Sequence, residues 1–255
     1  MRNVWTIARR ELRVYFTSPI GYIVLAMFAV MFGWFFASSL ILFAQVSAQA
    51  AMQPGVEGIN VNQYVVQPTL GNCTIMLLLT MPLITMRLFA EEQKQGTIEL
   101  LLTSPIGDYE IILGKWLGGM LLYGCMLLIS LLNFSVLLFY APLDWRAMLV
   151  AYLGLLLWGG AMMALGGFIS TTTANQIVAG SISFGLFLLL FVLVWAQSYW
   201  QSAFGQLAGY LSMPPHFEQF SKGVIELKDA TYYLTAIGLG LFLSKRSLES
   251  VRWKA

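Results

Sequence analysis

Charged side chains are scarce in this chain. Asp, Glu, Lys and Arg make up 10% of its 255 residues, whereas a soluble domain typically carries about 25%. Apolar and aromatic residues make up 58%, and several of their runs are long enough to cross about 30 Å of hydrocarbon. This balance excludes a soluble globular domain. It predicts an all-α, polytopic membrane protein in which residues 1–255 form a single transmembrane domain.

Histidine and cysteine are almost absent, which removes most routes to catalysis. The one histidine, His216, cannot build a two-histidine metal site within the chain, and no apolar run contains a histidine or lysine base at its centre. His216 follows Pro214 and Pro215, where we favour a turn or packing role over a weak contact to a metal or substrate. Cys73 and Cys125 lie in apolar runs and are interpreted as packing residues. We therefore expect no enzyme, and no catalytic, metal-binding or cofactor-binding residue.

A nucleotide site is also missing. The chain contains no G-x-x-x-x-G-K-[S/T] phosphate loop, because Gly114-Lys115 lacks the preceding glycine and stands near the start of an apolar run. The centres of the apolar runs contain no Asp, Glu, Lys, Arg or His, which are the residues that ion-coupled carriers commonly place there. A transporter with this sequence would need energy from another protein. A secondary carrier that binds ions through backbone carbonyls remains an open alternative.

Six apolar runs are candidate membrane spans. The first five are long enough to cross a bilayer as helices, since about 20 residues are needed. The sixth offers only about 14 apolar positions. We include it because Lys245 and Arg246 follow at once, as basic residues do at a cytoplasmic face; a re-entrant or interfacial helix is the alternative. The predicted spans are residues 20–43, 70–89, 111–139, 147–169, 177–196 and 230–243.

The basic residues predict that both termini face the cytoplasm. With that orientation the outer side carries Arg146, Lys222 and Lys228, and the other eleven of the 14 lysines and arginines lie inside. A bias of this size follows the positive-inside rule. We expect a multi-pass protein of the bacterial inner (cytoplasmic) membrane.

Residues 1–19 predict an amphipathic helix in the membrane interface. Apolar residues fall on one face of such a helix and three arginines on another flank, as in helices that bury one face in lipid and direct arginines to anionic headgroups. Thr17-Ser18-Pro19 should end the helix, because proline disfavours helix at the residue before it. The alternative is a cytoplasmic lead-in whose arginines only set the topology. The apolar face consists of Trp5, Ala8, Leu12, Tyr15 and Phe16.

Residues 90–110 form a charged segment between the second and third runs. Connections between helices usually take 2–8 residues, so a longer polar connection needs a reason. We predict a short cytoplasmic helix, kept out of lipid by its charges and followed by an apolar patch at Leu100 to Leu102 that is suited to docking in a groove. An ordinary solvated loop is the alternative. The charged residues are Glu91, Glu92, Lys94 and Glu99.

Small residues at a spacing of four predict close helix packing. Gly114 and Gly118 form a G-x-x-x-G pair in the third run, and Gly160 with Ala164 repeats the spacing in the fourth. Such pairs let helix backbones approach, either within one bundle or at a dimer seam. Asn133 is an amide deep in the third run, and we favour a hydrogen bond to another helix over a place on the substrate path.

Two further segments are expected on the outer side. Residues 45–67 are polar and contain Pro54-Gly55 and Gly58, which predicts an irregular loop. Residues 197–229 form an outer amphipathic segment, because apolar residues recur there at i, i+3, i+4 and i+7. We expect short helices lying on the outer leaflet or capping an exit path.

Short motifs follow one another around the polar connection. They are Glu91-Glu92, Gly96-Thr97, Glu99-Leu100-Leu101, Ser104-Pro105 and Gly114-Lys115. Together they resemble the signature of type 2 ABC exporter permeases, and Arg10-Glu11-Leu12 followed by Ser18-Pro19 is similar to the amino-terminal interface helix of that family. The segment 216–229, which begins His216-Phe217-Glu218, resembles the branch that contains GldF of gliding motility and NosY of copper-site maturation. The resemblance covers essentially the whole chain.

The resemblance implies six spans per permease, two permeases per transporter and separate cytosolic ATPase subunits. It implies that ATP and magnesium bind to the ATPase rather than to this chain. It also implies that the interface helix and the first cytoplasmic loop contact the ATPase as coupling elements. The coupling residues carried over by position are Arg10, Glu11, Leu12, Glu91, Glu92, Gly96, Thr97, Glu99, Leu100, Leu101 and Ser104.

The function expected from these observations is that of the membrane subunit of an ABC-type exporter. It would couple ATP hydrolysis in its partner to movement of a substrate, hydrophobic or amphipathic, across or out of the membrane. The expected partners are the ATPase, a second permease copy or paralogue, an accessory extracytoplasmic subunit and the lipid bilayer, with no nucleic acid. Two alternatives stay open: a force-transmitting or anchoring component that moves no cargo, and a secondary carrier.

Overall fold

The computed structural model describes residues 2–52, 60–98, 106–137, 143–199 and 203–252. Every regular element in these ranges is a helix, so the predicted all-α class is confirmed. In chain order the helices are α1 (Arg2–Thr17), α2 (Pro19–Ala51), the π-helical turn η1 (Asn62–Val66), α3 (Gln67–Thr85), α4 (Ala90–Gln95), α6 (Asp108–Leu137), α7 (Trp145–Thr171), α8 (Gln176–Tyr199), α9 (Ala203–Leu211), α10 (Pro214–Ser221) and α11 (Leu227–Arg252).

Five helical stretches in the described part of the chain are long and apolar enough to cross a membrane. They are α2, the stretch Asn62–Gln95 that contains α3, then α6, α7 and Gln176–Ala196 of α8. α11 is also long, with 26 residues, but it is less apolar than these five. The chain is therefore an integral membrane protein with at least five candidate spans, and the count of six stays a prediction.

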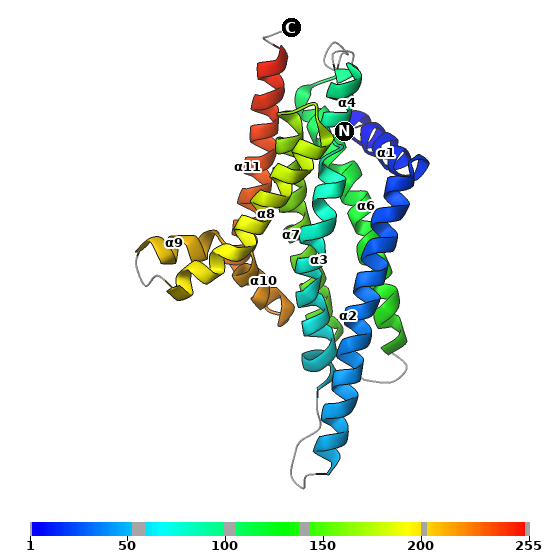
Figure 1. Ribbon diagram of the computed structural model, residues 1–255, viewed down its shortest axis with the longest axis vertical. Helices are drawn as coiled ribbons and strands as arrows, with labels where there is room; N and C mark the ends of the chain where they lie inside the picture. Colours follow the sequence, from blue (N-terminus) through cyan, green and yellow to red (C-terminus); the bar gives the residue numbers. More distant parts are fainter. Residues whose placement is uncertain (1, 53–59, 99–105, 138–142, 200–202, 253–255) are drawn as a thin grey trace.

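The long helices form a bundle with α7 at its centre. α7 packs against α3, α6, α8, α10 and α11, while α2 lies along α3 and α6 (Figure 1). Both chain termini lie at one end of the bundle, together with α1 and α4 (Figure 1); we call this the terminal end. α9 lies to one side of the bundle, and α10 packs back against α7 (Figure 1); we call this pair the lateral hairpin. The terminal end and the lateral hairpin are the two places where short helices join the bundle.

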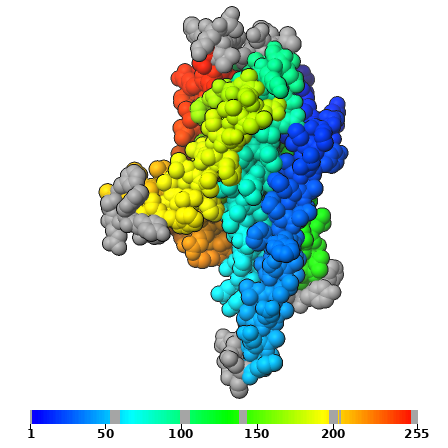
Figure 2. Space-filling model, in the orientation of Figure 1, coloured from blue at the N-terminus to red at the C-terminus, as the bar shows by residue number. Residues whose placement is uncertain are grey.

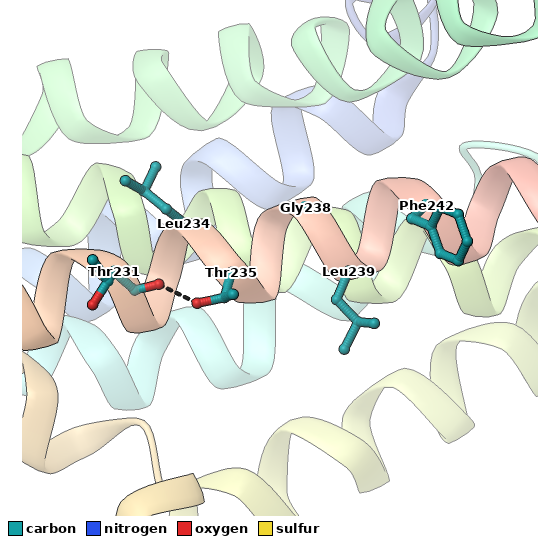
Figure 3. Close-up of a pocket in the computed structure, with 6 residues that line it drawn as sticks. All are labelled: Thr231, Leu234, Thr235, Gly238, Leu239 and Phe242. Atoms are coloured by element: carbon teal, nitrogen blue, oxygen red, sulfur yellow. Dashed lines mark hydrogen bonds between the residues drawn. The ribbon is translucent and has the colours of Figure 1, made fainter.

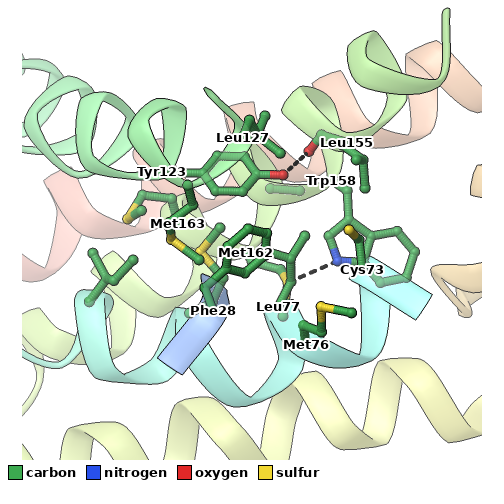
Figure 4. Packing of buried hydrophobic residues seen from close by; sticks show 14 of the residues in the cluster. Phe28, Cys73, Met76, Leu77, Tyr123, Leu127, Leu155, Trp158, Met162 and Met163 are labelled. Carbon is green, nitrogen blue, oxygen red and sulfur yellow. Dashed lines mark hydrogen bonds between the residues drawn. The ribbon is translucent and has the colours of Figure 1, made fainter. Parts of the chain in front are cut away.

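The core of the bundle is built from aromatic and sulfur-containing side chains (Figure 4). Trp158 of α7 is 1% exposed and its indole Nε1 donates to Met162 Sδ at 3.0 Å. Tyr123 of α6 is fully buried, and its hydroxyl donates to the Leu155 carbonyl at 2.7 Å. Cys73 of α3 is also buried here as a free thiol. A buried tyrosine or tryptophan needs a partner for its polar hydrogen, and both find one on α7.

The corner between α1 and α2 follows from three residues of the sequence. α1 ends at Thr17, and Ser18 adopts an extended conformation whose hydroxyl accepts a hydrogen bond from the Ile20 N–H. Pro19 then occupies the first position of α2, where its missing N–H costs nothing. The proline that was expected to end the interface helix therefore also begins the next one.

The prediction of an irregular loop over residues 45–67 is wrong at both ends. α2 continues through Ala51, and helical structure resumes with η1 at Asn62. The residues at the end of α2 are rich in alanine and glutamine, which favour helix whether or not they are apolar. Pro54, Gly55 and Gly58 lie outside the described residues. Polarity marked the edge of the apolar run here, not the edge of the helix.

The surface of the bundle is apolar where lipid would cover it. Val30 and Trp34 of α2 and Ile177 of α8 are each more than 70% exposed, and α2 and α8 form much of the face in Figure 2. One side of α11 bears a shallow groove of about 660 Å³, lined by apolar residues, two threonines and a glycine (Figure 3). The lining residues are Thr231, Leu234, Thr235, Gly238, Leu239 and Phe242.

Candidate coupling site

α4 occupies the first residues of the charged segment between the second and third predicted spans. It ends where Gly96 adopts a φ of 69°, a left-handed conformation that glycine adopts at little cost. That conformation lets the following N–H groups bond back to the last turn, and the Thr97 N–H donates to the Glu92 carbonyl at 3.0 Å. Gly96 and Thr97 thus serve to end α4.

Ser170 of α7 holds the start of α4. Its hydroxyl oxygen accepts hydrogen bonds from the N–H groups of Phe89 and Ala90, each at 3.0 Å. The first N–H groups of a helix lack intrahelical partners, so a serine from another helix acts here as the cap. Gln93 Nε2 also donates to the Thr171 carbonyl at 2.7 Å. α4 is therefore attached directly to the last turn of α7.

A buried ion cluster joins α4 to α1 and α6. Lys115 Nζ of α6 lies 3.0 Å from Glu11 Oε1 of α1 and 3.0 Å from Glu92 Oε1 of α4, and the lysine side chain is 2% exposed. Arg10 lies 3.6 Å from the same Glu92 oxygen, so two cations balance two carboxylates. The Phe89 ring covers the ammonium, with its centroid 5.2 Å from Nζ. Charges this buried have to stay paired, which ties the three helices together.

Arg87 links α4 to the corner between α1 and α2. Its guanidinium makes two hydrogen bonds to Glu91, at 2.8 and 2.9 Å, the bidentate geometry that gives strong pairs. Its third nitrogen donates to Ser18 Oγ at 3.0 Å. Near the end of α1, the Tyr15 hydroxyl donates to the Ile84 carbonyl at 3.0 Å. Burial raises the pKa of Tyr15, so its phenol stays a neutral donor.

Gly114 and Gly118 lie beneath α1 at the start of α6. A Cβ atom added to Gly114 would lie 2.6 Å from Ile7 Cβ, and one added to Gly118 would lie 2.5 Å from Glu11 Cβ. Glycine at both positions lets α1 approach α6 this closely, and the approach brings Glu11 within reach of Lys115. From the sequence this pair was expected in helix packing or a dimer seam, and the structure places it against α1 of the same chain.

The remaining candidates from the sequence lie deeper in the bundle. Gly160 and Ala164 of α7 face α11: a Cβ atom added to Gly240 of α11 would lie 2.6 Å from the Ala164 carbonyl carbon. Asn133 is half-buried in α6, and its Nδ2 donates to the Ile129 carbonyl of the same helix at 3.1 Å. That bond lies within one helix, whereas the sequence argument favoured a bond to another.

The coupling residues carried over from the family resemblance have different places in this site. Glu11 and Glu92 are buried in the ion cluster, and Glu91 is half-buried against Arg87. Leu12 is half-buried on α1. Basic residues remain on the outside of the site, namely Arg9, Arg10, Arg13 and Lys94, all exposed. Glu99, Leu100, Leu101 and Ser104 lie outside the described residues.

Three residues of the site were missed by sequence reasoning. Lys115 was noted only for standing near the start of an apolar run, Arg87 was counted only among the eleven basic residues placed inside, and Ser170 was not considered. Lys115 is paired with Glu11, 104 positions away, and Ser170 bonds to the main chain 80 positions away. The one local signal was a lysine directly after Gly114, in a helix whose glycines allow another helix to lie over it.

The fold and the site together define a polytopic helical membrane protein with a short polar helix rigidly attached to it. Among the described residues no group of three or more His, Cys, Asp and Glu side chains could hold a metal ion. The polar side chains of the site fix α4 to α1, α6 and α7 by hydrogen bonds and ion pairs. A displacement of α4 would move these helices with it.

Comparison with known proteins gives the family. The model of the family described as "ABC-2 family transporter protein" matches residues 5–222, so the chain belongs to the ABC-2 transporter family. The resemblance to type 2 ABC permeases is thereby confirmed. A protein of Pseudomonas aeruginosa (strain PAO1), described as "Probable ABC transporter permease protein NosY", is 34% identical over 122 residues, covering 46% of this chain and 39% of that protein. The matched part is thus less than half the length of that relative.

Proposed function

We propose that this chain is the permease subunit of an ATP-driven exporter and that ATP hydrolysis by a separate cytosolic ABC ATPase drives its movement. ATP and magnesium would bind to the ATPase. Membership of the ABC-2 family supports the pairing of a permease with an ATPase. The single observation that carries the coupling role is the ion cluster of Glu11, Glu92 and Lys115, because it fixes the short helix between spans to two other helices.

The basic outside of the site supports a contact with an acidic surface. Arg9 and Arg13 of α1 and Lys94 of α4 are exposed, whereas Glu11 and Glu92 of the site are buried. In the proposed cycle, ATP brings two ATPase subunits together and they press on α1 and α4. Because α4 is pinned to α6 and α7, the push moves the spans and shifts two permease copies against each other.

The orientation and the cargo belong to the same proposal. Both termini lie at the same end of the bundle as α4 (Figure 1), which supports placing them in the cytoplasm, with the protein in the bacterial inner membrane. A hydrophobic or amphipathic cargo is supported by the apolar grooves, one on α11 and another of about 490 Å³ between α6 and α7, where Leu131, Phe134 and Met148 lie. The second permease copy and an accessory extracytoplasmic subunit are further proposed partners.

Reversing the charge of Lys94 tests the contact with the ATPase. The chain, co-expressed with an ATPase encoded beside it, is purified and the bound ATPase and its hydrolysis rate are measured. We expect Lys94→Glu to weaken the association about tenfold, as reversal of an interface charge does. Lys222→Glu is the matched control, because Lys222 is half-exposed on the lateral hairpin and should leave association unchanged. Equal binding by both variants would contradict the proposed contact.

Reconstitution separates transport from the alternatives. The complex is placed in liposomes and movement of a fluorescent phospholipid is followed with and without ATP. ATP-dependent movement supports an exporter of apolar cargo. ATP hydrolysis that responds to the permease without any movement of the phospholipid would contradict the proposed apolar cargo and favour force transmission. Movement driven by an ion gradient in the absence of the ATPase would contradict the ATP-driven mechanism itself.

A further inference from the structure

The single histidine of the chain lies at the junction between the lateral hairpin and α11. His216, in the first turn of α10, is 5% exposed, and Asp229, in the first turn of α11, is 1% exposed. His216 Nδ1 lies 2.7 Å from Asp229 Oδ1. The pair therefore joins two segments of the chain at a place closed to solvent, well away from the coupling site.

The hydrogen bonds of His216 determine how many protons this pair holds. His216 Nε2 lies 2.9 Å from the Tyr210 carbonyl oxygen, which can only accept, so Nε2 has to carry a hydrogen. Nδ1 faces a carboxylate oxygen, which also accepts when aspartate is ionised. Both nitrogens of the ring then donate, and the ring is an imidazolium. This form of the pair is neutral overall, whereas a neutral histidine beside an ionised Asp229 would bury a net negative charge, which is unfavourable. The other neutral form, in which a protonated Asp229 donates to Nδ1, would leave one ring nitrogen without hydrogen.

Aromatic rings around His216 also favour the charged ring. The Tyr232 ring stacks on the imidazole at 4.0 Å between centroids with a 16° interplanar angle, and the Tyr210 ring meets it edge-on at 5.3 Å. A cation over the face of an aromatic ring is stabilised by the ring quadrupole. The charged residues nearby pair with each other nearer the surface, Lys222 with Glu218 and Lys228 with Glu226.

The hairpin is connected to the bundle on both sides of this pair. Tyr232 and Tyr233 of α11 donate their hydroxyls to main-chain carbonyls of the hairpin region at 2.7 and 3.0 Å. On the other side, Ser212 Oγ donates to the Leu190 carbonyl of α8 at 3.0 Å. Asp229 Oδ2 is buried and has no hydrogen-bond partner among the described residues. Without the imidazolium, this carboxylate would be left unsolvated.

α11 runs from this pair to the coupling site. At the terminal end, Ser247 Oγ donates to the Thr171 carbonyl at 3.4 Å, the same carbonyl that accepts a hydrogen bond from Gln93 of α4. Lys245 Nζ also lies 4.3 Å from the centroid of the Tyr109 ring, at the start of α6. One helix therefore has contacts with both the coupling site and the lateral hairpin.

We propose that His216 is doubly protonated and that, with Asp229, it is the positioning residue through which movement of α11 reaches the lateral hairpin. This relay rests on the proposed function, since it needs an ATPase acting on the terminal end. The protonation state does not depend on it. Breaking the pair would leave the hairpin packed against α7 and α8 but without its buried polar link to α11, and the hairpin would no longer follow α11 through this link.

The protonation state can be read directly, because His216 gives the only histidine signals of the chain. The full chain, labelled with ¹⁵N-histidine in lipid nanodiscs, is examined by NMR at neutral pH. We expect both ring nitrogens of the wild type to carry hydrogen, and Asp229→Asn to leave one of them without hydrogen. A wild-type ring with one bare nitrogen would overturn the proposal. This measurement needs neither an ATPase nor a cargo.

Hydrogen–deuterium exchange tests the attachment of the hairpin with a matched pair of variants. Asp229→Asn and Glu218→Gln each convert a carboxylate into an amide, but Glu218 is exposed and pairs within the hairpin. We expect amides of α9 and α10 to exchange at least about tenfold faster in Asp229→Asn and at the wild-type rate in Glu218→Gln. The same rates in both variants would overturn the role of the pair.

The relay itself is tested in the complex with the ATPase. In the wild type, adding ATP should change exchange in both α4 and the lateral hairpin, and Asp229→Asn should keep the change in α4 and lose it in the hairpin. An unchanged hairpin in the wild type, with α4 responding, would overturn the relay and leave the proposed function standing. Failure of the chain to bind the ATPase would instead remove the proposed function and, with it, the relay, while the histidine spectrum would still report the pair.

Discussion

The coupling site and the lateral hairpin are both short helices attached to the same bundle, but their attachments use different chemistry. At the coupling site, Lys115 is shared by Glu11 and Glu92, and a bidentate arginine pair adds a second link. At the hairpin, a histidine–aspartate pair is enclosed by tyrosines and main-chain carbonyls. The first attachment is a network of several charged side chains, whereas the second rests on a single imidazole–carboxylate pair.

The largest effect is expected from removing the shared cation of the coupling site. Lys115→Met keeps most of the side-chain length but leaves Glu11 and Glu92 buried without their ammonium, so it should lower the free energy of unfolding by about 3–5 kcal/mol. Thermal unfolding in detergent measures the loss. Lys245→Met is the control: its pair with Glu249 is about a quarter exposed on each side, so solvent screens it and its loss should have little effect on unfolding. Similar losses would erase the distinction between the buried cluster and an ordinary surface pair.

A smaller effect is expected from adding a methyl group at the close glycine contact between α6 and α1 that supports this cluster. Gly118→Ala would place a methyl group 2.5 Å from Glu11 Cβ, and the resulting shift of α1 should cost about 1–3 kcal/mol. Gly124→Ala lies in the same helix with nothing within 4 Å of the new atom and should be neutral or stabilising by up to about 1 kcal/mol. Unfolding temperatures and tryptic cleavage at Arg9 and Arg13 report the difference. If both variants show the same unfolding temperature and the same cleavage, α1 does not pack closely against Gly118 of α6.

The smallest effect is expected at the hairpin, from a change that spares the histidine. Tyr232→Phe keeps the ring that stacks on His216 but loses the hydroxyl bond to the Leu211 carbonyl at 2.7 Å, which should cost about 0.5–1.5 kcal/mol. Tyr22→Phe, at an exposed position, controls for the loss of a hydroxyl. Unfolding of the two variants is compared with wild type. A cost above that of Lys115→Met would make the hairpin, rather than the coupling site, the more firmly attached region.

The architecture could be predicted from the sequence where local chemistry decides it. Long apolar runs gave the five clear spans, and Thr17-Ser18-Pro19 placed the corner between α1 and α2 because capping and proline geometry act over a few residues. The same reasoning failed for residues 45–51, where helix propensity continued after apolarity stopped. Polarity reports exposure, and exposed residues can still be helical.

The site could be predicted only as a region. The charged segment 90–110 indicated a polar helix that interacts with something, but the sequence argument turned its carboxylates toward a partner, whereas Glu92 is buried against Lys115 and Arg10. The partners are far apart in the chain: Arg87 bonds to Ser18, 69 positions away. Similarly, His216 was expected in a turn or in packing, and nothing in its local sequence indicated that Asp229 would face it. Pairing across helices depends on how they pack, which periodicity does not specify.

The length of α2 has a consequence for the side of the membrane opposite the termini. Its 33 residues make a rod of about 50 Å, while about 30 Å suffices to cross the hydrocarbon. Figure 1 shows α2 extending past the neighbouring helices at that side. The last turns of α2 would therefore extend beyond the hydrocarbon on that side, where a protein approaching along the membrane surface would meet them before it met any span.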